Sequence, residues 1–153
     1  MYERLFPRVA DNRYAGHRVG LWLLALMLLK IAMGLNVMIN APFIARTADG
    51  VAVDTFAAPA AAAFSFVFAA WGLGQFVLGL LCLVVLLRYR SLVPLAFLPL
   101  LIEQVGRMLL RFHWPVERIA TAPGTTINLA LTALMLVGFG LSLWRSRAAS
   151  TGV

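Results

Sequence analysis

The chain has 153 residues, of which 62% are hydrophobic and 12% are charged, whereas a soluble domain is about half apolar and a quarter charged. This excess of apolar residues argues against an ordinary soluble domain and predicts a protein whose solvent is lipid. The formal net charge of +7 does not indicate nucleic-acid binding, because the arginines separate apolar runs and form no continuous basic patch. We therefore expect membrane lipids, and no nucleic acid, among its partners.

Residues 1–18 form a basic juxtamembrane segment before the first long apolar run. Four arginines are spaced along this segment, Arg4, Arg8, Arg13 and Arg18. We interpret the segment as an anchor at anionic headgroups, with docking to a cytoplasmic partner as the alternative. Asp11 or Asn12 is expected to cap a short helix that runs into the first span. The apolar run behind the segment is too long for a cleavable signal peptide.

Residues 19–147 are predicted to form one membrane domain of four spans, followed by a polar tail at residues 148–153. The spans are predicted at residues 19–40, 61–87, 92–112 and 125–144, each long enough to cross a hydrocarbon core of ~30 Å.

The connections between the spans carry their own signals. An Asp49-Gly50 pair after the first span, between Ile44-Ala45-Arg46 and Val51-Ala52-Val53, suggests a small hairpin-like turn. The link at residues 88–91 is so short that the second and third spans should form an antiparallel hairpin. Pro94 and Pro99 should kink the third span and free carbonyls near Glu103.

The arginines predict the orientation of the chain. With four spans, both termini lie on one side of the membrane, and that side collects most of the arginines: Arg4, Arg8, Arg13, Arg18, Arg88, Arg90, Arg145 and Arg147. The other side has Arg46 and Arg118, with Arg111 near the span end. The positive-inside rule then places both termini in the cytoplasm. We predict an all-α integral membrane four-helix bundle, up-down-up-down, in a bacterial inner membrane.

The polar residues within the spans fall into two layers when depth is counted at 1.5 Å per residue. The deeper layer lies near the bilayer centre and comprises Lys30, Gln75, Glu103, Gln104 and Thr132. The second layer lies about one turn closer to the outer face and comprises Asn36, Arg107 and Asn128. Ionisable side chains within a membrane are costly unless they are paired, so they are candidates for a functional site.

Lys30 is the only lysine in the chain, and Glu103 at the same depth is its natural partner. Glu103 also precedes Arg107 by four residues on one helical face, and Arg111 continues that stripe. We therefore expect a buried cluster of Lys30, Glu103 and Arg107, with Gln75 and Gln104 as hydrogen-bonding neighbours. Its surplus positive charge could hold an anionic headgroup, a carboxylate or a quinone oxygen.

Small residues indicate which helix faces should pack closely. Gly72, Gln75, Gly79 and Cys82 form one stripe at helical spacing, and small residues allow close helix approach in lipid. The bulky Phe68 one turn earlier predicts that the close approach begins at Gly72. Buried polar groups could therefore serve only to join the helices and fix their register.

No motif for enzymatic chemistry is found in the sequence. Cys82 is the single cysteine, and His17 and His113 are expected on opposite sides of the membrane. We accordingly predict no metal site, no haem and no other cofactor. Nucleotide-binding, nucleophile-elbow and metalloprotease motifs are absent, and no catalytic residue can be assigned.

The basic N-terminus, the two hairpins of membrane helices and Lys30 in the first span resemble the DoxX-like group of small bacterial inner-membrane proteins. That resemblance implies an association with membrane redox complexes. In that group a glycine tends to precede the lysine, whereas here the order is Lys30-Ile31-Ala32-Met33-Gly34. Four helices with one membrane carboxylate also resemble small multidrug-resistance transporters. Those transporters carry the carboxylate in the first span, whereas Glu103 lies in the third.

Three functions follow from these observations. The leading hypothesis is a non-enzymatic accessory or scaffold subunit, acting in a homo-oligomer or a larger membrane complex, whose polar cluster is structural. The second is a binding or catalytic site for a lipid-like or quinone-like molecule held by Lys30, Arg107 and Asn128. The third is a proton-coupled transporter that works as an oligomer, with Glu103 as the proton carrier.

Overall fold

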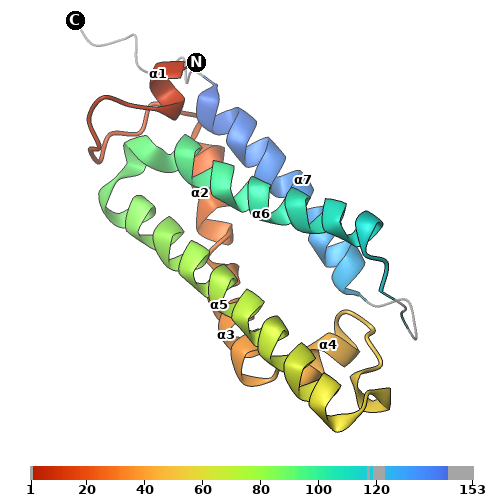
Figure 1. Cartoon of the computed structure of the whole chain (residues 1–153). Helices are drawn as coiled ribbons and strands as arrows, with labels where there is room; N and C mark the ends of the chain where they lie inside the picture. Colours follow the sequence, from red (N-terminus) through yellow and green to blue (C-terminus); the bar gives the residue numbers. More distant parts are fainter. Residues whose placement is uncertain (1, 117, 119–122, 145–153) are drawn as a thin grey trace, which may run out of the picture.

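The fold is described from a computed structural model that covers residues 2–116, 118 and 123–144. Across these residues the chain forms helices and no strand (Figure 1). Four helical segments are long and apolar enough to cross a membrane, at Arg18–Ile39, Ala58–Arg88, Arg90–His113 and Gly124–Leu143. The predicted all-helical class with four such segments is therefore confirmed. Arg145, Arg147 and the tail at 148–153 lie outside the described residues.

The helices follow one another with short connections. They are α1 (Tyr2–Leu5), α2 (Arg18–Leu26), α3 (Leu29–Ile39), α4 (Ala41–Thr47), α5 (Ala58–Arg88), α6 (Val93–His113) and α7 (Gly124–Leu143). Two short 3₁₀ turns, η1 (Val53–Thr55) and η2 (Arg90–Leu92), precede α5 and α6. Tyr89 and η2 are all that separates α5 from α6, which matches the tight hairpin expected from the sequence.

The N-terminal segment, the α5–α6 connection and the C-terminal end of α7 lie together at one end of the molecule (Figure 1). The backbone N–H of Asp11 donates to the Ser91 hydroxyl at 2.9 Å, and that hydroxyl donates to the Asp11 carbonyl at 2.9 Å. The Arg4 guanidinium donates to the carbonyl of Leu143 at 3.1 Å. These contacts join three parts of the chain at one end of the molecule.

The first span is broken, although its sequence predicts one continuous helix. Between α2 and α3 the backbone makes three-residue turns, with the N–H of Leu28 donating to Ala25 and that of Lys30 donating to Met27. Neither proline nor glycine occurs between Leu26 and Lys30. The two halves have different packing partners, since α2 packs mainly on α7 and α3 on α5. Tertiary packing therefore overrides the helical propensity of the segment.

The glycine stripe of α5 explains how closely α3 approaches it. The buried residues of α5 are Gly72, Gln75, Gly79 and Cys82, so the predicted stripe is confirmed. A Cβ atom at Gly34 of α3 would lie 2.6 Å from the Gly72 carbonyl oxygen. Only glycine can occupy such a contact, and the resulting proximity of the two backbones brings their polar side chains within reach of each other.

The connection after the first span differs from the predicted hairpin-like turn. Residues 44–46 belong to α4, which has Pro42 in its first turn, where proline is tolerated. Gly50 has φ 72° and ends the helix, because the N–H of Val51 bonds back to the carbonyl of Ala45 at 3.0 Å. Burial of Ala45 with Val51 and Val53 favours this helix over extended segments. At this end the N–H of Gly124 also donates to the carbonyl of Ala48 at 2.9 Å.

The predicted cap of the first span is wrong, and so is the position predicted for the carbonyls that the prolines of the third span free. His17 caps α2, because its imidazole accepts the N–H of Val19 at 3.3 Å, whereas Asp11 accepts the N–H of Arg13 in the preceding segment.

The prolines of the third span also act differently from the expectation. Pro94 lies in the first turn of α6, where a missing N–H costs nothing. Pro99 lies inside α6. Because proline has no N–H, it leaves the carbonyl four residues earlier without its helical hydrogen bond. That carbonyl belongs to Leu95, which is not near Glu103.

Candidate functional site

The buried site is organised around Lys30 on α3. Its side chain is 2% exposed, and its ammonium donates to Glu103 Oε2 on α6 at 2.9 Å. It also donates to Gln75 Oε1 on α5 at 3.2 Å. The structure thus brings the predicted ammonium and carboxylate into direct contact, and the glycine contact between α3 and α5 positions Gln75 beside them.

The carboxylate of Glu103 is shared by donors from three helices. While Oε2 accepts from Lys30, Oε1 accepts from Arg107 Nε at 3.1 Å and from the Trp71 indole N–H at 3.1 Å. The guanidinium of Arg107 lies over the Trp71 ring, 4.6 Å from its centroid, a distance suited to a cation–π interaction. Arg107 is therefore held by both an ion pair and an aromatic face.

The network continues through α6 to α7. Arg107 donates to Gln104 Oε1 at 2.7 Å and to Asn128 Oδ1 at 3.2 Å. The Gln104 amide donates in turn to the Asn128 carbonyl at 3.1 Å, and Gln104 is fully buried. The cluster of Lys30, Trp71, Gln75, Glu103, Gln104, Arg107 and Asn128, hereafter the polar cluster, thus joins one helix from each of the four spans.

Three of the polar residues predicted at membrane level lie outside the polar cluster or only touch it. Asn36 accepts a hydrogen bond from the Asn40 amide at 2.8 Å on the exposed side of α3. Thr132 donates to the Asn128 carbonyl at 2.7 Å within its own helix. Arg111 points instead toward Thr125, with a long contact of 3.5 Å.

Trp71 is the member that the sequence did not predict. It lies four residues before Gln75 on α5, so both can face the same neighbour, and a buried indole N–H usually needs an acceptor. That combination is the signal that could have identified it. It was hidden because Trp71 follows the run of Phe64, Phe66 and Phe68, which indicates apolar packing.

The chemistry of the polar cluster is that of a satisfied network. No buried side-chain nitrogen or oxygen in the described part of the chain lacks a hydrogen-bond partner. The same residues offer no group of three His, Cys, Asp or Glu side chains that could hold a metal ion. Two cations and one carboxylate leave a surplus positive charge, which Trp71, Gln75, Gln104 and Asn128 distribute through hydrogen bonds and the aromatic face.

Comparison of the chain with protein-family models, with curated proteins and with solved structures finds no match.

Proposed function

We propose that this protein is a non-enzymatic, multi-pass membrane protein that serves as an accessory or scaffold subunit. In this proposal the polar cluster fixes the register of the four spans and carries no substrate. The observation that supports it is the completeness of the network: four spans contribute to it, and each of its buried polar atoms in the described residues has a partner. Buried polar residues are best attested in such a register-setting role.

A proton-coupled transporter is a weaker alternative for this site. A proton carrier must exchange between bonded and free states during transport. Glu103, however, accepts hydrogen bonds from Lys30, Trp71 and Arg107 at once. Protonation of Glu103 would disturb contacts to three helices, so such an exchange would disrupt the packing of the bundle.

We further propose an up-down-up-down arrangement in a bacterial inner membrane, with both termini in the cytoplasm. The arginines support this orientation, because the N-terminal segment and the α5–α6 connection lie at the same end and carry Arg4, Arg8, Arg13, Arg18, Arg88 and Arg90. Arginine-rich flanks favour the cytoplasmic side. A relation to the DoxX-like group stays a prediction from the sequence.

The scaffold proposal can be tested on the tagged full-length protein. After extraction from membranes in mild detergent, its complex would be sized and its partners counted, alongside Glu103→Gln and the control Asn36→Ala. We expect the wild type and Asn36→Ala to elute in the same assembly and Glu103→Gln to lose it. Wild type that elutes as a lone monomer would contradict the proposal.

A second measurement separates the scaffold from the transporter. Proteoliposomes carrying the wild type would be given a pH gradient and a panel of labelled solutes. The scaffold proposal expects no gradient-driven solute uptake. Uptake by the wild type that Glu103→Gln abolishes would assign Glu103 a transport role instead.

A further inference from the structure

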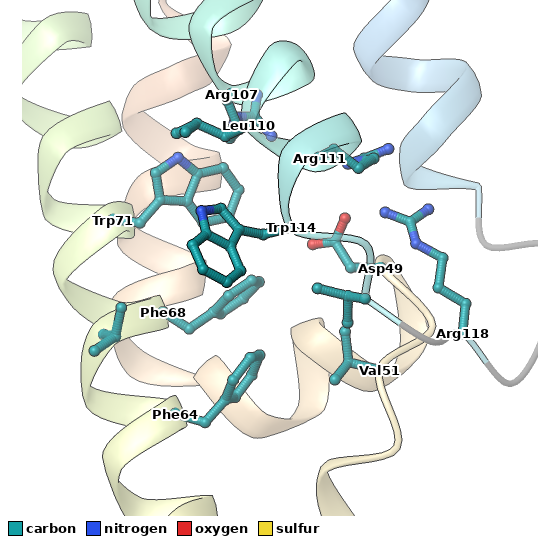
Figure 2. Close-up of a pocket in the computed structure, with 12 residues that line it drawn as sticks. Asp49, Val51, Phe64, Phe68, Trp71, Arg107, Leu110, Arg111, Trp114 and Arg118 are labelled. Atoms are coloured by element: carbon teal, nitrogen blue, oxygen red, sulfur yellow. The ribbon is translucent and has the colours of Figure 1, made fainter.

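A pocket of about 290 Å³ adjoins the polar cluster and shares Arg107 with it. The helices α5 and α6 lie close together at their connection and diverge away from it (Figure 1). Residues from α5, from α6, from the connection after α4 and from the segment after α6 line the pocket (Figure 2). Its volume is close to the lower limit for small-molecule sites, which suits a headgroup better than a whole lipid.

Two arginines at the pocket converge on one neutral group. Arg118 donates to the Thr125 hydroxyl at 2.7 Å, and Arg111 approaches the same hydroxyl oxygen at 3.5 Å. Among the described residues, no carboxylate forms an ion pair with either guanidinium. The Asp49 carboxylate lies beside both of them (Figure 2) and interacts electrostatically with Arg111, but one carboxylate offsets only one of the two positive charges. Like charges held together in this way repel each other, and an anion between them would relieve that repulsion.

Arg107 differs from these two arginines because its hydrogen bonds are already committed. It donates to Glu103, Gln104 and Asn128 and lies over the Trp71 ring. It therefore forms a fixed, positively charged wall of the pocket. Arg111 and Arg118 are the guanidiniums with donors to spare, and a guanidinium fork matches the oxygens of a phosphate group.

The remaining walls are apolar and aromatic. Phe64 stacks on Phe68 with centroids 5.7 Å apart, and Phe68 lies 5.0 Å from Trp71. Val67 is 66% exposed and Trp114 is 70% exposed, so a hydrocarbon chain that extends out of the pocket would contact apolar side chains. The pocket thus presents cationic donors beside a hydrocarbon-compatible surface.

We propose that this pocket binds the phosphate of an anionic phospholipid between Arg111 and Arg118, with the acyl chains against Phe64, Val67 and Phe68. The location supports a lipid over a soluble anion. Arg111 and Trp114 lie at the end of a span, where headgroups are found and where tryptophan is favoured. A basic pocket between transmembrane helices is a known form of headgroup recognition.

The test uses the purified full-length protein in detergent, titrated with phosphatidylglycerol, phosphatidylcholine or inorganic phosphate and followed by native mass spectrometry. We expect phosphatidylglycerol to bind selectively, and the variant Arg111→Gln/Arg118→Gln to weaken its binding roughly 10- to 30-fold. The matched control Arg88→Gln/Arg90→Gln, which removes two arginines from the opposite end, should bind like the wild type.

The single variant Arg118→Gln provides a test if the double variant misfolds. It should fold normally, because Arg118 lies beyond the end of α6. It should weaken phosphatidylglycerol binding by about five-fold. Wild-type affinity in Arg118→Gln, or equal binding of phosphatidylcholine, would overturn the proposal. Inorganic phosphate binding as tightly as phosphatidylglycerol would show an anion site that does not select lipids, which overturns it too.

Discussion

Glu103→Gln should destabilise the protein more than any other conservative change at a polar residue in the spans. The substitution keeps the size of the side chain and one carbonyl oxygen, but removes the negative charge. Lys30, at 2% exposure, is then buried without its counter-ion. Arg107 loses its ion pair as well, so both cations of the polar cluster are affected together.

The magnitude follows from the two ion pairs of Glu103, at 2.9 Å to Lys30 and 3.1 Å to Arg107. At an effective dielectric constant of about 20, each is worth on the order of 5 kcal/mol of Coulomb attraction, most of which offsets the desolvation of the charges. Removing one partner of a buried pair costs about 3–5 kcal/mol. Because a glutamine oxygen can still accept one hydrogen bond, we expect a loss of about 3 kcal/mol in the free energy of unfolding.

The assay is unfolding from mixed micelles by increasing SDS, followed by tryptophan fluorescence, for the wild type, Glu103→Gln, Lys30→Met and the double variant. The double variant should be more stable than the sum of the single losses predicts, by about 1–3 kcal/mol. Asn36→Ala removes a polar group outside the polar cluster and should cost less than about 1 kcal/mol. A Glu103→Gln loss below about 1 kcal/mol, or additive losses, would refute the reasoning.

Three further predictions concern packing, capping and pH. In the same SDS assay, Gly34→Ala should lower the free energy of unfolding by about 1–3 kcal/mol, since its Cβ would lie 2.5 Å from the backbone nitrogen of Phe76. The control Gly74→Ala, with open space around it, should be neutral or slightly stabilising. Equal losses of stability in the two variants would contradict the packing argument. His17→Ala removes the cap of α2 and should cost about 1 kcal/mol, seen as faster amide hydrogen exchange in the first turn of α2 alone. Burial raises the pKa of Tyr14 to about 12 from a usual 10.0; because the folded state then holds the proton more tightly, stability should be constant below pH 10 and fall toward pH 12. Tyr14→Phe should abolish that alkaline loss, and an unchanged loss would exclude Tyr14 as its source.

The parts of the fold that could be predicted are those dictated by lipid as a solvent. Lys30 and Glu103 interrupt apolar runs, and a charge at that depth must find a partner, so their contact follows from few assumptions. The stripe of Gly72, Gln75, Gly79 and Cys82 repeats at helical spacing, and these four are the buried residues of α5. In both cases a single local pattern carries the information.

The parts that could not be predicted depend on partners distant in sequence. The break between α2 and α3 contains no helix-breaking residue, so no local signal marks it. Trp71 joins the polar cluster only because Glu103, 32 residues later, presents an oxygen to it. Likewise α4 forms because Ala45 can be buried against Val51 and Val53, which the Asp49-Gly50 pair alone does not reveal.

The split first span has a consequence for how the chain is assembled as it is synthesised. Its second half, α3, packs on α5, the next span to leave the ribosome, so that pair can form early. Its first half, α2, packs mainly on α7, which is translated after α5 and α6. Helix α2 therefore gains its main packing partner only when α7 has been synthesised, and a nascent chain that stops before α7 would leave α2 without that partner.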